Sequence, residues 1–145
     1  MDNAQGDRIV AQLGLKYARF VDDKAFDRMQ EIMAEDVVMA APAFECKSLE
    51  AFMTQLEFLH QFSGTLHIIG NQLGEWNGDT YQGETYCVAS HIYEKNGKGR
   101  KLEMGIRYDD TIAPIDGCFK YTRRYLNIVW ESDLALSDNS EDSIG

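Results

Sequence analysis

Four long segments in the second half of the chain have the composition of β-strands, and they constrain the fold more than any other feature of the sequence. They are rich in Tyr, Ile, Val and Thr, and they cover residues 65–76, 80–94, 101–112 and 118–130. Short clusters of Asn, Asp and Gly separate them, which predicts an antiparallel meander. At about 3.3 Å per residue the strands are longer than a small flat sheet needs, so we expect a strongly curved sheet.

The first half of the chain carries helical patterns instead. Apolar residues at steps of four, four and three predict an amphipathic helix that begins near Asn3, and they are Ile9, Leu13, Tyr17 and Phe20. A shorter helix is predicted over 26–33, a short strand over 37–40, and a third helix after a cap at Ser48. Helices followed by a meander define an α+β domain, in which we expect three N-terminal helices to pack in a curved, mainly antiparallel sheet.

Length and composition favour a single domain with its own core. The chain has 145 residues, of which 44% are hydrophobic, and this is near the commonest size for one domain. We place the domain at 1–131 and expect an acidic, disordered tail at 132–145, because acids gather at this end without any Lys or Arg between them. These acids are Glu131, Asp133, Asp138, Glu141 and Asp142.

The charge and the cysteines argue against several classes of protein. A formal charge of −10 repels phosphate backbones and anionic lipid, so we expect no nucleic-acid partner and no membrane partner. The three cysteines, Cys46, Cys87 and Cys118, match neither a disulfide framework nor a zinc ribbon. The first residues lack the features of a signal peptide, and no window resembles a membrane span. We therefore expect a cytoplasmic protein with reduced thiols.

Two histidines on successive predicted strands are the candidates for chemistry. The chain has only three histidines, and His67 and His91 lie in the first two segments of the meander. An imidazole titrates near ~6.5, so a carboxylate that holds one ring N–H leaves the other nitrogen as a base at neutral pH. Asp22, at the end of the first predicted helix, is the candidate carboxylate.

Each of these residues also has a structural interpretation. Asp22 can cap the next helix, and His67 can be a core histidine with its hydrogen bonds satisfied. A tight turn at Asn77-Gly78 places Val88 opposite His67 and sends His91 to the other face of the sheet. An odd-length loop or a β-bulge restores both histidines to one face.

Several short motifs follow one another in a fixed order along the chain. They lie at 17–22, 32–37, 66–71, 78–79, 107–110, 116–119 and 123–124. Their order and spacing resemble the SnoaL-like branch of the nuclear-transport-factor-2-like superfamily, especially its scytalone dehydratase and hexachlorocyclohexane dehydrochlorinase members, and the likeness covers residues from about 6 to 130. The resemblance implies a cone-shaped α+β barrel with a deep apolar pocket, usually oligomeric, that catalyses eliminations, isomerisations or cyclisations without metal or organic cofactor.

The resemblance also implies roles for single residues. Asp22 and His67 match the family's carboxylate–histidine pair, and His91 matches a second histidine that we expect to act as an acid. Tyr17 and Tyr108 match pocket side chains that can donate a hydrogen bond to an enolate, and Arg124 lies near a pocket position. The sequence departs from the family pattern in two places, where Phe119 replaces a tryptophan and Val21 replaces a tyrosine.

From these residues we expect a cofactor-independent, metal-free lyase, most simply a dehydratase that acts on a hydrophobic cyclic substrate of the steroid, terpenoid or polyketide type. An isomerase or cyclase with the same pocket is the alternative, and a non-catalytic ligand-binding or assembly subunit is a third. We also expect a homo-oligomer, a dimer or trimer, that buries the outer face of the sheet. The expected apolar pocket wall comprises Phe20, Met39, Phe52, Leu56, Ile69 and Met104.

Overall fold

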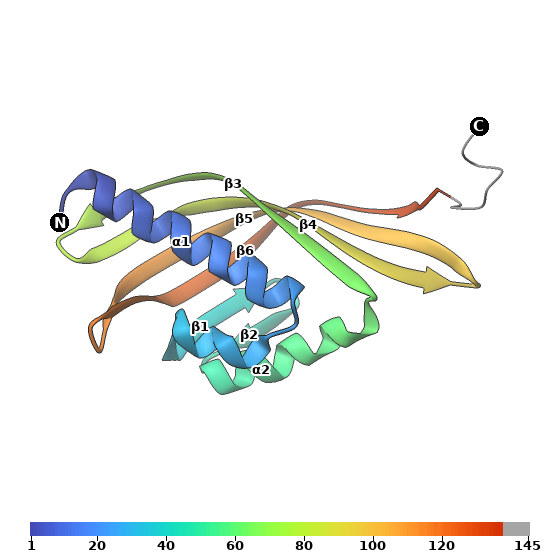
Figure 1. Ribbon diagram of the computed structural model, residues 1–145, viewed down its shortest axis with the longest axis horizontal. Helices are drawn as coiled ribbons and strands as arrows, with labels where there is room; N and C mark the ends of the chain where they lie inside the picture. Colours follow the sequence, from blue (N-terminus) through green and yellow to red (C-terminus); the bar gives the residue numbers. More distant parts are fainter. Residues whose placement is uncertain (138–145) are drawn as a thin grey trace.

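A single curved sheet forms most of the protein in the computed structural model, which describes residues 1–137 (Figure 1). The strand order in the sheet is β2-β1-β6-β5-β4-β3, and all neighbours are antiparallel except β1 and β6. The expected α+β class and mainly antiparallel curved sheet are confirmed. The strands are β1 (Met33–Ala41), β2 (Phe44–Cys46), β3 (Gly64–Asn77), β4 (Thr80–Lys95), β5 (Lys98–Ile115) and β6 (Cys118–Ala135).

Two α-helices and two 3₁₀ helices accompany the sheet. They are α1 (Asn3–Asp22), η1 (Phe26–Glu31), α2 (Leu49–Leu56) and η2 (Glu57–Gln61). The capping-box contacts of Asp2 and Gln5 begin α1, and the Ser48 side chain accepts a hydrogen bond from the N–H of Ala51 to begin α2. The second predicted helix is only the short η1, because Met33 already pairs with β6 in the sheet. The third ends as an α-helix at Leu56, and β2 was not predicted.

Tight turns close the meander where the sequence places Asn, Asp and Gly. Asn96-Gly97 and Asp116-Gly117 both take positive φ, as a two-residue type I′ hairpin turn requires. Where β3 meets β4, the turn residues are Gly78 and Asp79, one position later than the Asn77-Gly78 turn considered above.

β-Bulges interrupt the ladder at several points and change which face a side chain takes. One lies in β3 between Ile69 and Gln72. Two more lie in the β5–β6 pairing, one of them between the Gly105–Trp130 and Ile106–Ile128 pairs. An extra residue in one strand shifts every later side chain to the opposite face and increases the local bend. The bulges therefore help to curve the sheet and to choose what faces its concave side.

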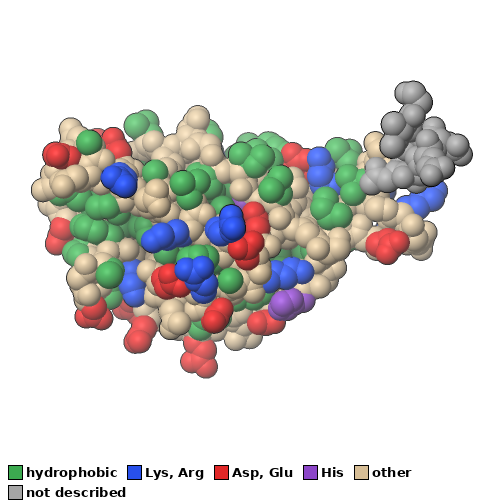
Figure 2. Space-filling view, viewed as in Figure 1, with side chains coloured by type: hydrophobic (Ala, Val, Ile, Leu, Met, Phe, Trp, Pro, Cys, Tyr) green, Lys and Arg blue, Asp and Glu red, His purple; other side chains and the backbone are tan. Residues whose placement is uncertain are grey.

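The core lies between the concave face of the sheet and the helices. Helix α1 presents Val10, Leu13, Tyr17 and Val21 to it, and all four are buried. The face shown in Figure 2 mixes acidic and basic side chains and has no large patch of one sign. On the convex face of the sheet, which points away from the core, several apolar side chains are exposed, and they are Leu66, Ile68, Tyr86, Val88 and Val129.

Strand β6 continues to Ala135, past the boundary expected at 131. Residues 138–145, which make up most of the expected tail, lie outside the described residues. Among residues 1–137, neither α-helix has the length and apolar content needed to cross a bilayer.

Candidate active site

The end of α1 and the start of β3 bring Asp22 and His67 together. Oδ1 of Asp22 lies 2.7 Å from Nδ1 of His67, and the His67 side chain is only 6% exposed. The same carboxylate accepts a hydrogen bond from the Thr65 hydroxyl at 2.8 Å and from the backbone N–H of His67 at 2.9 Å. Three donors from one strand thus hold the carboxylate, and Asp22 does not cap the next helix, whose N-cap is Ala25.

This arrangement sets the protonation of the pair. Partial burial alone would raise the pKa of Asp22, but the hydrogen bonds from His67 and Thr65 outweigh it and hold the pKa below its ordinary value. Asp22 is therefore a carboxylate at neutral pH and can only accept. The proton between Asp22 and His67 belongs to Nδ1 of the ring, which leaves Nε2 of His67 as its free nitrogen.

His91 lies beside His67 on the concave face because of the bulge in β3. The turn at Gly78-Asp79 pairs residues whose numbers sum to 157, and this register would pair His67 with Ser90. After the bulge His67 pairs with Ala89, so His91 falls on the same face and its ring centroid lies 5.9 Å from that of His67. The bulge considered from the sequence is present.

The environment of His91 keeps its ring neutral. Burial lowers its pKa, and although the bond to Leu102 opposes this, the pKa stays below the ordinary value for histidine. Nδ1 of His91 lies 3.2 Å from the carbonyl oxygen of Leu102, which can only accept a hydrogen bond. Nδ1 therefore carries the proton, and Nε2 of neutral His91 has a free lone pair.

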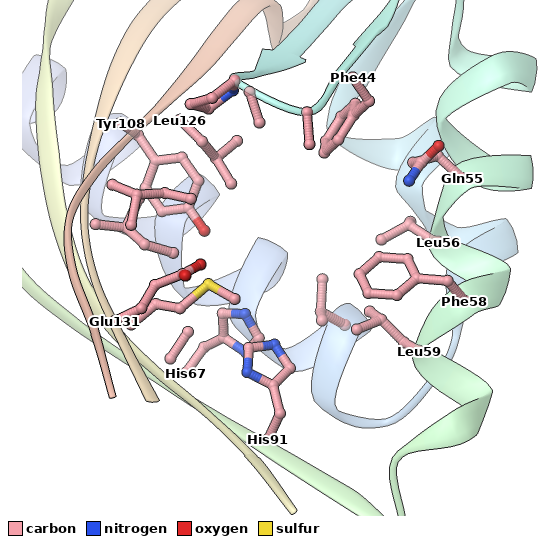
Figure 3. A pocket seen from close by; sticks show the side chains of 18 of the residues that line it. Phe44, Gln55, Leu56, Phe58, Leu59, His67, His91, Tyr108, Leu126 and Glu131 are labelled. Carbon is pink, nitrogen blue, oxygen red and sulfur yellow. The ribbon is translucent and has the colours of Figure 1, made fainter. Parts of the chain in front are cut away.

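Both histidines line a cavity of about 670 Å³ that is largely apolar (Figure 3). In Figure 3, Gln55, Leu56, Phe58 and Leu59 of α2 and η2, together with Phe44 of β2, lie across the hollow from Tyr108, Leu126 and Glu131. The wall also includes Tyr17 and Val21 of α1 and a row of sheet side chains, which are Ala89, Met104, Ile106, Tyr108, Leu126, Ile128, Trp130 and Glu131. The volume is typical of small-molecule sites.

Tyr17 and Tyr108 form a polar corner of the wall. Their ring centroids lie 5.7 Å apart in an edge-to-face arrangement. Burial raises the pKa of Tyr17 to about 12, although the Arg124 guanidinium opposes this, and burial raises the pKa of Tyr108 as well. Both phenols therefore keep their protons at neutral pH and can donate hydrogen bonds.

Arg124 lies behind the tyrosines and outside the cavity wall. Its guanidinium forms two hydrogen bonds to Asp110, at 2.7 and 3.2 Å, and both side chains are fully buried. The guanidinium carbon lies 3.8 Å from the ring centroid of Tyr108 and 4.4 Å from those of Tyr17 and Tyr121. The sequence placed Arg124 near a pocket position, but in the structure its side chain forms an internal ion pair behind the cavity wall.

The apolar residues expected in the wall divide into two groups. Phe52, Leu56 and Met104 line the cavity, whereas three others do not. The guanidinium carbon of Arg28 lies 4.4 Å from the ring centroid of Phe20, and Ile69 packs on α1 near Gly14. Met39 is fully buried within the core cluster. A helical stripe or a strand alternation identifies a buried face, but it does not separate core from cavity.

Several wall residues were not expected from the sequence. Gln55, Phe58 and Trp130 lie around the cavity, and Glu131 points into it (Figure 3). By sequence, Glu131 counts among the acids of the C-terminal end. It directly follows the strand-like segment 118–130, which is a signal that it continues a strand, but the face that its side chain takes depends on a bulge. In the described part of the chain no three His, Cys, Asp or Glu side chains are placed to hold a metal ion.

A curved α+β cone with a histidine–carboxylate pair inside an apolar cavity defines a class of small-molecule-binding domains. The SnoaL-like domain model matches residues 5–125, and the chain belongs to this family. The expected family is confirmed. Among the curated proteins, no sequence matches the chain.

Solved structures of the same fold include enzymes of the lyase kind. A protein assigned as a scytalone dehydratase from Novosphingobium aromaticivorans superposes with a TM-score of 0.82 at 22% identity, covering 93% of this chain and 91% of that one. A hexachlorocyclohexane dehydrochlorinase from Novosphingobium barchaimii gives 0.79 at 13%, covering 90% and 91%. A β-subunit assigned to an aromatic-ring-hydroxylating dioxygenase, also from Novosphingobium aromaticivorans, gives 0.70 at 16%, covering 88% and 92%. At these identities the likeness establishes the fold.

Proposed function

We propose that this protein is a cofactor-independent lyase, a dehydratase that removes water from a hydrophobic cyclic substrate. The observation that carries the proposal is the 2.7 Å contact between Nδ1 of His67 and Oδ1 of Asp22 beside an apolar cavity. A carboxylate that fixes the tautomer and stabilises the imidazolium makes the opposite nitrogen an effective base. The family and its lyase-type relatives support the same class of chemistry.

In the proposed first step Nε2 of His67 takes a proton from a carbon next to a carbonyl group. The electron pair of the broken C–H bond moves toward the carbonyl oxygen, and the Asp22 carboxylate stabilises the imidazolium that forms. Tyr17 and Tyr108 donate hydrogen bonds to the developing enolate oxygen. Preorganised donors of this kind contribute roughly 10²-fold or more each.

In the second step the enolate electron pair forms the carbon–carbon double bond and the carbonyl group is restored, while the carbon–oxygen bond breaks and the leaving hydroxide takes the proton carried by His67. This restores the neutral base and releases one water, so no other acid is required. His91 suits a different role from the acid expected from the sequence, since its lowered pKa and the Nδ1–H bond to Leu102 leave Nε2 as an acceptor. We assign it to holding the leaving hydroxyl group in place.

The test is a screen of steroid alcohols and cyclic hydroxy-ketones, with loss of water followed by mass spectrometry. The proposal expects turnover by the wild type and a loss of roughly 10²–10⁴-fold in His67→Ala and in Asp22→Asn. His60→Ala is the control, because His60 is a half-exposed histidine on η2 that pairs with Glu57. Turnover that survives both substitutions in the pair would remove the proposal.

An isomerase or cyclase reaction in the same cavity is the second candidate. It needs the His67 base and the tyrosine donors but no departure of hydroxide. Activity that is kept in His91→Ala and lost in His67→Ala, with a product of unchanged mass, would favour it.

A non-catalytic subunit is the third candidate, and the dioxygenase β-subunit of the same fold motivates it. Such a protein would bind apolar ligands with full affinity and without turnover. Its ligand affinity would also be unaltered by Asp22→Asn.

A further inference from the structure

A row of four side chains crosses the concave face of the sheet from His67 to Glu131. His67 pairs with Ala89, Ala89 with Met104, and Met104 with Glu131, so the four lie side by side on β3, β4, β5 and β6. All four line the cavity. The row therefore carries the candidate base at one end and a carboxylate at the other, with a small and a flexible side chain between them.

A bulge in β6 turns Glu131 toward the cavity. Ile128 pairs with Ile106 and Trp130 with Gly105, so Val129 is the extra residue. Ile128 and Glu131 both line the cavity although they are three residues apart, whereas Val129 is 62% exposed. Regular alternation from Ile128 would place Glu131 on the convex face. Bulges are over-represented next to active sites, where they re-aim a side chain.

The Glu131 carboxylate has no ion-pair or hydrogen-bond partner among residues 1–137. Two acids close to it in the sheet do have basic partners, since Asp133 binds Arg100 at 2.9 Å and Glu103 binds Lys101 at 2.6 Å. No Lys or Arg of the described chain lines the cavity. In Figure 3 the Glu131 side chain points into the hollow beside His67 and Tyr108. Glu131 is exposed to solvent, so its carboxylate lies where the cavity opens and is available to a donor on a ligand bound in the hollow.

We propose that Glu131 is a substrate-recognition residue that accepts a hydrogen bond from a hydroxyl group on an uncharged polycyclic substrate. This inference rests on the proposed function and names the substrate class of the same site. Among the described residues, Glu131 is the acid in the cavity wall and Asp22 lies behind His67, while Arg124 is neutralised by Asp110 behind the tyrosines. The site therefore disfavours substrates with carboxylate or phosphate groups.

The size of the row fits such a substrate. Three strand spacings of about 4.8 Å separate the two backbones by roughly 14 Å along the sheet. The side chains of His67 and Glu131 extend inward from both ends, which leaves room over Ala89 for two or three fused rings. The substrate then spans from the base to the carboxylate, and its hydroxyl at the Glu131 end is one that the reaction does not remove.

Binding of small probes, without turnover, tests this inference. The probes are 2-naphthol, naphthalene, 2-naphthoate and protonated 2-naphthylmethylamine, and isothermal titration calorimetry measures their binding. We expect Glu131→Leu to weaken the binding of 2-naphthol by about 3- to 10-fold, as for a hydrogen bond that competes with water at an exposed side chain, and to leave the affinity for naphthalene within about twofold. The affinity of Glu131→Gln for 2-naphthol should lie between those of the wild type and Glu131→Leu, and its affinity for 2-naphthoate should exceed that of the wild type.

The matched control is Glu103→Gln, on the neighbouring strand, where Glu103 pairs with Lys101 outside the cavity wall. This substitution should leave the affinity for every probe unchanged. Equal losses for naphthol and naphthalene in Glu131→Leu, or no loss for either, would overturn the proposal, and so would an amine that binds the wild type far more tightly than naphthol.

Binding and turnover together separate the two proposals. If Glu131 discriminates between the probes in the wild type and in His67→Ala but the dehydration screen shows no turnover, only the proposed reaction is wrong. If the discrimination is missing in both backgrounds, this inference is wrong.

Discussion

Among residues 1–137, a partly buried and a fully buried carboxylate each pair with a basic side chain, and their surroundings differ. Asp22 pairs with His67 at the cavity, whereas Asp110 pairs with Arg124 where both side chains are 0% exposed. Asp110 also accepts a hydrogen bond from the Thr85 hydroxyl at 2.8 Å, and three tyrosine rings surround the guanidinium. One pair meets a hollow large enough for a ligand, and the other is sealed inside protein.

The two pairs differ in the basic residue and in whether a ligand can reach it, and these two properties decide which pair can transfer protons. Histidine loses and regains a proton near neutral pH, so a pair that contains it can move protons if a ligand reaches it. Arginine keeps its charge at every accessible pH. Desolvation by burial lowers the pKa of Arg124, but the charge of the Asp110 carboxylate outweighs this and holds the pKa above its ordinary value. The Asp22–His67 pair is therefore suited to catalysis, and the Asp110–Arg124 pair to holding β5 and β6 in register behind the tyrosines.

The largest expected effect breaks the cavity pair. His67→Ala should reduce turnover of a dehydration substrate by roughly 10²–10⁴-fold, because the base is removed. The free energy of unfolding should change less than it does when the Asp110–Arg124 pair is broken, since the His67 ring already borders an open cavity. Steady-state kinetics and urea unfolding of the same preparation check both expectations. A global loss of structure in His67→Ala would assign the pair to stability and end the contrast with Asp110–Arg124.

The sealed pair should respond in the opposite way. Arg124→Met should lower the free energy of unfolding by about 3–5 kcal/mol, because it leaves the Asp110 charge buried without a partner.

Arg123→Met is the matched control for this change. Arg123 pairs with Asp109 at 3.2 Å one position away on the same strands, but the two side chains are 45% and 52% exposed. It should cost less than about 1 kcal/mol. Equal losses in the two variants, measured by urea unfolding, would show that burial does not distinguish the pairs.

A smaller effect concerns His91, the second histidine of the cavity. Burial lowers its pKa, so the unfolded chain takes up a proton at His91 near pH ~6.5 while the folded protein still leaves the ring neutral. The contribution of this residue to stability is present above that pH and is lost as the pH falls. Urea unfolding at pH 8 and pH 5.5 should therefore show a smaller acid-induced loss in His91→Gln than in the wild type. An identical loss would show that the ring is not desolvated.

The smallest effect on the cavity is expected from the convex face. The expected homo-oligomer stays a prediction, and Val88→Asp tests it, because Val88 lies among the exposed apolar side chains of that face. The variant should shift the mass measured by sedimentation toward the monomer. Its turnover should stay within about twofold of the wild type, because Ala89 and not Val88 lines the cavity. An unchanged mass would place any self-association elsewhere.

Most of the sheet could be predicted from local chemistry. The meander segments matched β3 to β6 because Gly, Asn and Asp mark the tight turns and β-branched and aromatic residues fill the strands. The second helix was overestimated, since Ile32 and Met33 continue a helical spacing by chance and Met33 is already in β1. The short strand β2 carries too few residues for a periodic signal.

The candidate site was predictable in its residue types but not in its geometry. Asp22, His67 and His91 meet at one place, and Tyr17 and Tyr108 line the same cavity. Two residues differ from expectation. Arg124, expected near the pocket, is buried behind the cavity wall, and Glu131, expected among the C-terminal acids, faces the cavity. Bulges in β6 lie beside both residues, and no local pattern marks where a bulge falls.

By itself the sequence determined the order of helices and strands, the turns between them and the resemblance that singled out Asp22 and His67. The elements and turns depend on neighbours in the chain, through backbone preferences and side-chain periodicity, whereas the pairing of Asp22 with His67 is what the family resemblance implied. Only the tertiary structure decided which face His91 and Glu131 take, and which carboxylate meets a cavity. Those outcomes depend on pairing across strands, where one inserted residue reverses every side chain that follows it.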